Sequence, residues 1–259
     1  MDGNVVLALA IPVLGTTLGS AFVFLMRGSM PRRAEKALLG FASGVMVAAS
    51  VWSLLIPSMK MTAGNGQWAS APAAIGFALG MGFLLLIDTF TPHLHAVGDK
   101  PEGVRSHLSK ASMLALAVAI HNLPEGMAVG VVVADAIDTG GVTAAGVWAV
   151  SLGIAIQNIP EGAIISMPLK AAGGGAWRSF GIGTLSGLVE PVGALAVMAL
   201  AEVMKGALPY LLGFAAGAML YVVVEELIPE ASAGKHSNVS TIGFGAGFIL
   251  MMMLDTILS

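Results

Sequence analysis

The sequence predicts an all-α polytopic membrane protein, and composition, long apolar stretches and an inverted internal repeat all favour that fold class. Of its 259 residues, 56% are hydrophobic and only 10% are charged, and the mean hydropathy is +0.88. A soluble domain carries about 25% charged residues, so this chain is expected to be solvated by lipid. It has no cysteine, which excludes thiolate metal sites.

Eight stretches are apolar enough to cross a bilayer as helices, which takes about 20 residues each because every backbone polar group must be satisfied within the segment. They cover residues 4–26, 37–59, 72–92, 111–134, 142–169, 179–204, 208–230 and 239–258. The first is expected to be a retained helix, because "MDGNVV" has an acid where a signal peptide has basic residues. Together they predict one transmembrane domain over residues 1–259.

The basic residues predict the orientation of these helices. Ten of the twelve Lys and Arg residues fall in loops on one side of the predicted bundle, and the other two are Lys60 and Lys205. Cytoplasmic loops are enriched in Lys and Arg. We therefore expect both termini to lie outside the cytoplasm.

An internal repeat relates helices 2 and 3 to helices 7 and 8. Residues 76–90 align without a gap to residues 243–257, and residues 40–57 align to residues 213–229 with a one-residue gap. An odd number of crossings separates the copies, so they are inverted in the membrane, and Asp88 and Asp255 become equivalent carboxylates at opposite mouths. The predicted plan is 3+2+3, although helix 1 cannot be matched to helix 6. Such repeats are typical of transporters.

The two central helices carry related polar hexapeptides, "HNLPEG" at 121–126 and "QNIPEG" at 157–162. Side chains at i and i+4 share a helix face, so His121 points with Glu125 and Gln157 points with Glu161. The proline before each glutamate is expected to kink its helix. Helix 6 adds a mid-span acid before a proline. The polar groups placed in these spans are His121, Asn122, Glu125, Gln157, Asn158, Glu161 and Glu190.

The three glutamates predict a bound cation. One charged side chain at the bilayer centre costs about 2.5–3.5 kcal/mol, so three cost on the order of 10 kcal/mol. No Lys or Arg lies in the middle of any span to neutralise them. Either the acids are protonated or a divalent metal joins them. An imidazole ligand favours a transition metal over Mg²⁺ or Ca²⁺, and the thioether of Met46 in helix 2 either adds a soft ligand or packs in the core.

In this order, "HNLPEG", "QNIPEG" and "SGLVEP" resemble the ZIP (Zrt/Irt-like) divalent-metal transporters, and more closely their GufA-like prokaryotic branch. The resemblance covers essentially the whole chain. It implies uptake of Zn²⁺, with Fe²⁺, Mn²⁺, Co²⁺ and Cd²⁺ as related substrates, into the cytoplasm across the bacterial inner membrane. It also implies a homodimer. No cofactor and no nucleic-acid partner are expected.

Position by position, the resemblance implies two adjoining metal sites. The first would use His121, Glu125, Gln157, Glu161 and Met46, and the second would use Asn122, Asn158 and Glu190 with Glu125 and Glu161 as bridges. The position of Asn158 is aspartate in some relatives. Because the amide here is neutral, we expect the second site to be weaker.

The resemblance also implies a release path on the cytoplasmic side. His93 and His95, just beyond Asp88, would form it together with Glu226 on helix 7. Glu225 and Glu226 point about 100° apart on a helix, so at most one is expected to face the path.

Two alternatives to a metal transporter remain at this stage. An intramembrane metalloenzyme would also place His and Glu on one helix face. The chain lacks H-E-x-x-H, however, and shows no separate base or nucleophile, so we expect no enzymatic activity. The second alternative is a proton- or sodium-coupled carrier of another solute, in which the glutamates carry protons.

Overall fold

The computed structural model describes residues 3–25, 30–91, 110–138, 140–171, 173–204 and 206–258, and it describes the backbone alone for residues 110–119, 121 and 168. All regular structure within these ranges is helical. The elements are α1 (Gly3–Leu25), α2 (Arg32–Ala49), η1 (Ser50–Leu55), α3 (Ile56–Met61), η2 (Ala63–Trp68), α4 (Ala71–Phe90), α5 (Lys110–Asp138), α6 (Ala144–Ala171), α7 (Ala176–Gly187), α8 (Val189–Val203), α9 (Leu208–Val222), η3 (Val223–Leu227), α10 (Ile228–Ser232) and α11 (Val239–Leu258). The all-α fold class is confirmed.

Six segments within the described residues have the length and apolarity of membrane-spanning helices. They are Gly3–Leu25, Arg32–Met61, Ala71–Phe90, Ala176–Val203, Leu208–Ser232 and Val239–Leu258. The second begins at Arg32 rather than at residue 37. Two further long helices, α5 and α6, have 29 and 28 residues and contain the polar hexapeptides, which lower their hydropathy. The total of eight crossings remains a prediction.

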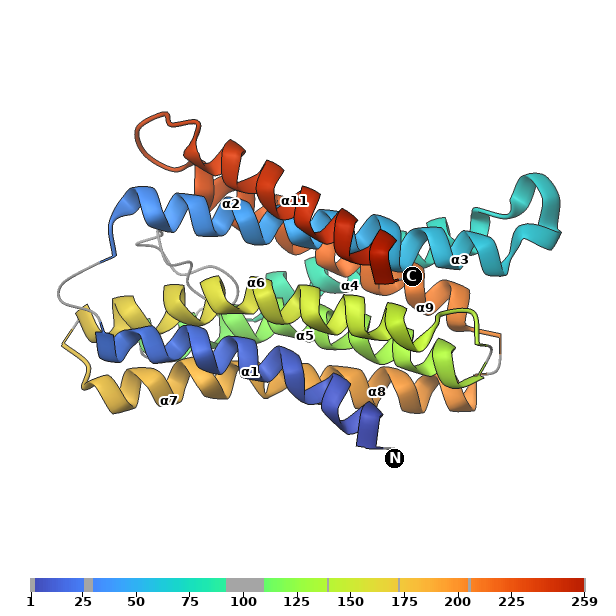
Figure 1. The fold of residues 1–259 in the computed structure, drawn as a ribbon, viewed down its shortest axis with the longest axis horizontal. Helices are drawn as coiled ribbons and strands as arrows, with labels where there is room; N and C mark the ends of the chain where they lie inside the picture. Colours follow the sequence, from blue (N-terminus) through green and yellow to red (C-terminus); the bar gives the residue numbers. More distant parts are fainter. Residues whose placement is uncertain are drawn as a thin grey trace.

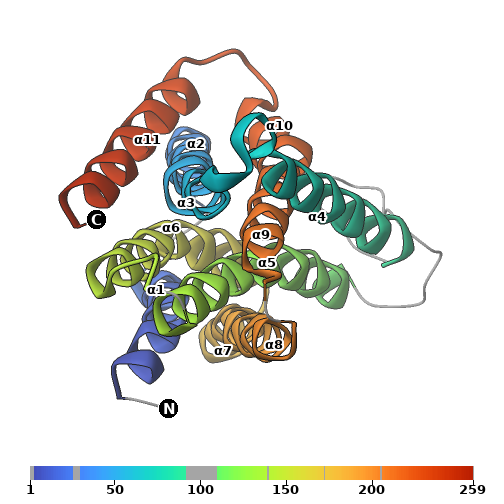
Figure 2. The same cartoon turned by 90° about the vertical axis from the view of Figure 1, so that its right-hand side faces the viewer.

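The long helices form two groups that lie one above the other in Figure 1. One group contains α1, α5, α6 and the α7–α8 pair, and the other contains α2–α3, α4, α9–α10 and α11 (Figures 1 and 2). The most extensive helix–helix contacts join members of the same group, namely α1 with α6, α5 with α8, α2 with α11 and α4 with α9. Contacts of α5 with α9 and of α6 with α2 connect the two groups.

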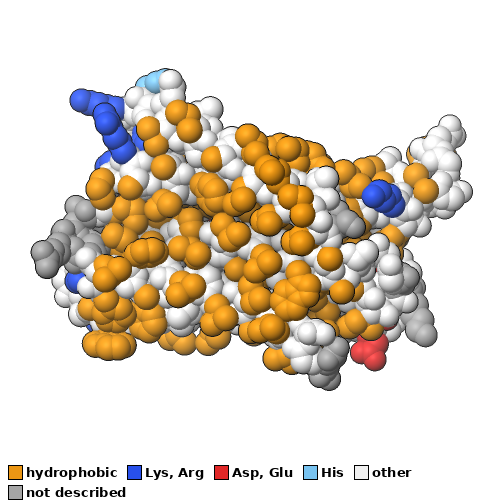
Figure 3. All heavy atoms as spheres, viewed as in Figure 1, with side chains coloured by type: hydrophobic (Ala, Val, Ile, Leu, Met, Phe, Trp, Pro, Cys, Tyr) orange, Lys and Arg blue, Asp and Glu red, His pale blue; other side chains and the backbone are white. Residues whose placement is uncertain are grey.

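The surface and the interior have the polarity expected of a protein in lipid. Figure 3 shows hydrophobic side chains spread over most of one face of the bundle, with Lys and Arg only toward its two ends. Large apolar side chains such as Leu18, Leu86 and Ile242 are exposed, whereas Glu125 and Glu190 are buried. Apolar groups therefore face outward, and the acids in the middle of the central helices face inward.

Glycines at equivalent repeat positions have equivalent packing roles. A Cβ atom at Gly80 on α4 would collide with the carbonyl oxygen of Phe214 on α9, and one at Gly247 on α11 would collide with that of Phe41 on α2. Gly76 and Gly243 repeat this relationship one turn earlier in their helices. Small residues allow such close backbone approach in membranes, and here they pair α4 with α9 in the same way as α11 with α2.

The same type of contact supplies the correspondence that the sequence comparison did not find. Gly19 of α1 packs against the backbone of Ile159 on α6, and Gly193 of α8 packs against that of Leu123, at the same place in the other hexapeptide, on α5. The α1–α6 pair thus matches the α8–α5 pair. In packing, helix 1 corresponds to the α7–α8 segment, which is interrupted by a turn at Leu188.

Two π-helical turns lie at equivalent places in the repeat. η1 ends just before Ile56–Pro57, and η3 ends just before Ile228–Pro229. Proline has no N–H and clashes with the carbonyl four residues back, and a wider π turn accommodates this. η1 has six residues and η3 has five, so the one-residue gap in the repeat alignment falls within this turn.

Candidate metal site

The predicted polar cluster lies where α5, α6, α8 and α1 meet. α5 and α6 continue as α-helices through Pro124 and Pro160, so these prolines do not end them. Glu190 lies in the first turn of α8, directly after the break at Leu188. The positive end of a helix dipole favours an acid at that position.

A hydrogen bond connects the two hexapeptides. Gln157 Nε2 on α6 donates to Glu125 Oε1 on α5 at 2.8 Å, and both side chains are fully buried. The first residue of one hexapeptide therefore contacts the fifth residue of the other. This contact places a carboxylate and an amide side by side between adjacent helices.

Glu190 Oε1 accepts hydrogen bonds from three helices. Asn158 Nδ2 of α6 donates at 2.9 Å, Thr16 Oγ1 of α1 at 3.1 Å and Asn122 Nδ2 of α5 at 3.5 Å. Asn122 Nδ2 also donates to the carbonyl oxygen of Ser186 at 3.0 Å. Three of the side chains predicted for the second site therefore meet at one carboxylate oxygen, and these three donors to it are neutral.

Five acceptor oxygens of this cluster are left without donors among the described residues. The buried atoms with no hydrogen-bond partner in the described structure include Asn122 Oδ1, Glu125 Oε2, Gln157 Oε1, Asn158 Oδ1 and Glu190 Oε2. Buried polar atoms are nearly always paired, so five orphaned acceptors in one cluster require an explanation. They are the hard oxygen ligands that a divalent cation prefers, and the amide oxygens add capacity without adding charge.

Three further residues were predicted as ligands of the first site. Glu161 is partly buried on α6, one turn beyond Gln157. Met46 is fully buried in the hydrophobic core on α2, and its role as a ligand stays a prediction. For His121 the structure gives only its backbone position on α5. Among the described His, Asp and Glu side chains no group of three is arranged to hold a metal.

The predicted pathway acids have partners on neighbouring helices. Tyr221 Oη on α9 donates to Asp88 Oδ2 at 3.0 Å, and Ser53 Oγ on η1 donates to Asp255 Oδ1 at 2.6 Å. Glu226 is buried whereas Glu225 is exposed, and the role of Glu226 in a release path stays a prediction. His93 and His95 lie outside the described residues.

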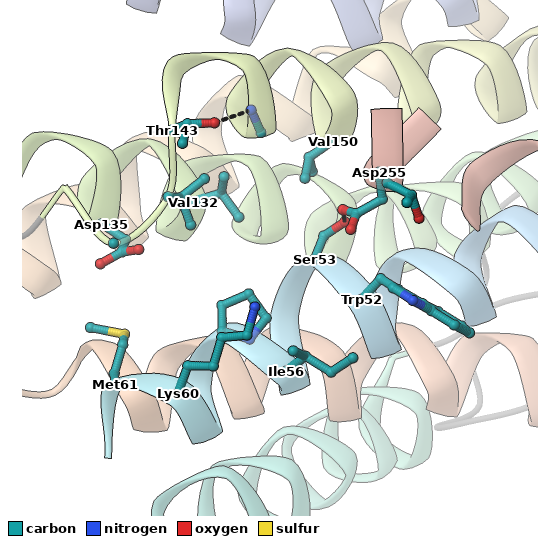
Figure 4. Close-up of a pocket in the computed structure, with 15 residues that line it drawn as sticks. Trp52, Ser53, Ile56, Lys60, Met61, Val132, Asp135, Thr143, Val150 and Asp255 are labelled. Carbon is teal, nitrogen blue, oxygen red and sulfur yellow. Dashed lines mark hydrogen bonds between the residues drawn. The ribbon is translucent and has the colours of Figure 1, made fainter. Parts of the chain in front are cut away.

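A cavity of about 630 Å³ opens at the end of the bundle where α11 ends (Figure 4). Segments from both helix groups line it: η1 and α3 on one side, α5 and α6 on the other, and α11 at the edge. Its charged lining residues are Lys60, Asp135 and Asp255. We call it the outer cavity. Only Asp255 was predicted from the sequence, because Lys60 and Asp135 resemble ordinary charges at helix ends.

We call the polar cluster between α1, α5, α6 and α8 the inner cluster, and Thr16 is its member that was not predicted from the sequence. Its only signal is a hydroxyl in the middle of the first apolar stretch. Thr17 has the same signal, and both hydroxyls donate to the carbonyl four residues back, Thr16 to Pro12 at 3.4 Å and Thr17 to Val13 at 2.8 Å. Thr16, however, also donates to Glu190. The distinction between the two depends on the packing of α1 against α8.

An apolar outer surface around a buried cluster of acids and amides defines a polytopic membrane protein with a polar interior of the transporter type. The chain belongs to the ZIP zinc transporter family: residues 98–255 match the family described as "ZIP Zinc transporter". The resemblance seen in the sequence, including that to the GufA-like branch, is confirmed.

Similarity to individual family members extends over almost the entire chain. Zinc transporter ZIP11 of Homo sapiens is 36% identical over 322 aligned positions, covering 93% of each protein. Zinc transporter GufA of Myxococcus xanthus is 36% identical over 245 positions, covering 93% of this chain and 94% of GufA. Zinc transporter ZIPB of Bordetella bronchiseptica is 39% identical over 261 positions, covering 99% of this chain and 82% of ZIPB.

Proposed function

We propose that this protein transports divalent transition-metal cations, with Zn²⁺ as the main substrate and Fe²⁺, Mn²⁺, Co²⁺ and Cd²⁺ as further ones, through the buried cluster on α5, α6 and α8. The observation that carries the proposal is the set of five orphaned acceptor oxygens around Glu125 and Glu190, whose donors are all neutral. The relatives' names, which are those of zinc transporters, support the choice of metal.

The cluster is suited to transient binding. Glu125 and Glu190 each use one oxygen for hydrogen bonds within the protein and keep the other available. Amide groups are both donors and acceptors, so Gln157, Asn122 and Asn158 can donate to the acids without metal and present oxygen to a cation when one arrives. Because these amide donors stabilise one oxygen of each acid when no metal is present, the metal-free state is less unfavourable, and a bound metal can leave more readily.

The arrangement in two groups supports alternating access. The group of α1, α5, α6 and α7–α8 carries the cluster, and close glycine–backbone contacts hold each group together. In our proposal the cluster-bearing group moves as a unit relative to α2–α3, α4, α9–α10 and α11. The metal then passes from the outer cavity to the opposite end of the bundle.

The proposal also covers the membrane in which the protein lies, its orientation there and its oligomeric state. The distribution of Lys and Arg supports an orientation with both termini outside the cytoplasm, and similarity to bacterial relatives supports the bacterial inner membrane. Uptake is therefore directed into the cytoplasm. We further propose that the protein is a homodimer and has no enzymatic activity.

The test is zinc uptake into proteoliposomes that contain an internal zinc indicator. Glu125→Gln and His121→Ala are expected to abolish uptake while the purified proteins keep their helical content and elution volume. Glu202→Gln, which changes an exposed acid near the end of α8, is the control and should transport as the wild type does. Undiminished uptake in both site variants would overturn the assigned site. Absence of zinc binding by the wild type would favour a proton- or sodium-coupled carrier.

A further inference from the structure

A lysine lies at the edge of the outer cavity. The side chain of Lys60 on α3 extends toward the space between Asp135 on α5 and Asp255 on α11 (Figure 4). Lys60 is exposed, whereas Asp135 is fully buried and Asp255 is 8% exposed. A cation arriving from solvent therefore meets the ammonium group before it meets the two carboxylates.

This arrangement is unexpected for a cavity through which cations pass. A positive charge at the mouth lowers the local concentration of cations and opposes their approach. The lysine side chain, however, is a compact charge on a flexible four-carbon stem, so its ammonium group can move aside without any change in the helix. Its charge also has a favourable effect, since it compensates the carboxylates while no metal is present.

We propose that Lys60 is a specificity-determining residue that acts as a tethered counter-ion of the outer cavity. This inference rests on the proposed function, because it takes the outer cavity as the route to the inner cluster. A monovalent cation gains no more from the carboxylates than the ammonium group already does, so it does not displace Lys60. A dication gains about twice as much at the same distance and does displace it. Lys60 thus excludes Na⁺ and K⁺ at the cost of a weaker apparent affinity for the metal.

The experiment is zinc uptake by Lys60→Met and Lys60→Glu in proteoliposomes, as a function of zinc concentration and of KCl. At low ionic strength, the half-saturating zinc concentration should fall about threefold in Lys60→Met. This is the effect expected when one positive charge is removed about 10 Å from a dication. It should fall further in Lys60→Glu, which also adds a negative charge. KCl should then inhibit both variants more strongly than the wild type, because K⁺ now enters the cavity. Choline chloride at the same ionic strength should inhibit them less than KCl.

The matched control is Gln67→Glu in η2. It makes the same change in charge as Lys60→Met, at the same end of the bundle, but Gln67 is exposed and does not line the cavity. It should leave both the zinc and the KCl dependence unchanged. The role of Lys60 is overturned if Lys60→Met behaves like the wild type, and equally if it behaves like Gln67→Glu. If Glu125→Gln also keeps full uptake, it is the proposed inner site that has failed.

Discussion

Gln157 on α6 donates a hydrogen bond of 2.8 Å to Glu125 Oε1 on α5, and both side chains are fully buried between the two central helices. The bond pairs a neutral donor with an acid and leaves one oxygen of each side chain without a donor. The metal-free interior is therefore stabilised by a contact that also keeps acceptor groups available. Substitutions in this cluster should therefore change the stability of the metal-free protein and its stabilisation by metal in different ways.

Gln157→Glu should destabilise the metal-free protein. The substitution removes a buried hydrogen bond, which costs about 1–3 kcal/mol, and places a second carboxyl group beside Glu125. Zinc should offset this loss, because a ligand that binds the folded state stabilises that state, and tighter binding stabilises it more. Thermal unfolding in detergent should show a lower midpoint in EDTA and a larger zinc-induced rise than in the wild type. An unchanged midpoint in EDTA would contradict the buried contact.

Thr16→Val should destabilise the metal-free protein by removing a hydrogen bond to Glu190. Valine keeps the shape of threonine but removes the hydroxyl that donates to Glu190 Oε1 at 3.1 Å. We expect a loss of about 1–2 kcal/mol in the free energy of unfolding of the metal-free protein, measured by denaturant titration in detergent.

The adjacent Thr17→Val is the matched control for this prediction. Its hydroxyl donates only to Val13 of its own helix, at 2.8 Å, and it is partly buried. This variant should lose little stability, because the bonded carbonyl also belongs to the helical backbone. Equal losses in the two variants would mean that the bond from Thr16 to Glu190 contributes nothing specific.

Asn158→Asp should strengthen the second site. The amide of Asn158 donates to Glu190 Oε1 at 2.9 Å, and an aspartate there would add charge and remove the donor. Without metal the two acids repel one another, and with metal both become ligands. Equilibrium dialysis followed by metal analysis should show more zinc bound per chain than in the wild type. Asn238→Asp, at an exposed loop position, should leave the stoichiometry unchanged. The same stoichiometry in all three proteins would rule out a second site at this position.

Much of the inner cluster was predictable, because an acid in a membrane-spanning helix is costly in lipid and therefore faces the interior of the bundle. Glu125, Glu190 and their amide neighbours lie in apolar stretches that contain no Lys or Arg, so the sequence alone indicates that they face inward and toward one another. The repeat was predictable for a related reason. Its glycines are needed for helices to approach closely, and they therefore recur at the same spacing in both copies.

Features that arise from contacts between distant helices were not predictable. A threonine in a helix can satisfy its hydroxyl on the carbonyl four residues back, as Thr17 does, and nothing in the sequence indicates that Thr16 donates to Glu190. Lys60 and Asp135 likewise read as charges at helix ends. They acquire a shared environment because α3 and the α5–α6 turn line the same cavity.

The close approach of α4 to α9 can be tested with two glycines on the same helix. A Cβ atom at Gly80 would collide with the backbone oxygen of Phe214, whereas one at Gly82 would have no heavy atom within 4 Å. Gly80→Ala should therefore separate the helices and lower the unfolding midpoint in detergent. Gly82→Ala should be neutral or slightly stabilising, since glycine in a helix is about 0.5–1 kcal/mol less favourable than alanine. α9 continues into η3, which carries Glu226 of the predicted release path, so a displaced α9 should also slow zinc uptake in Gly80→Ala. Equal midpoints for the two variants would show that the backbones of α4 and α9 lie farther apart than described.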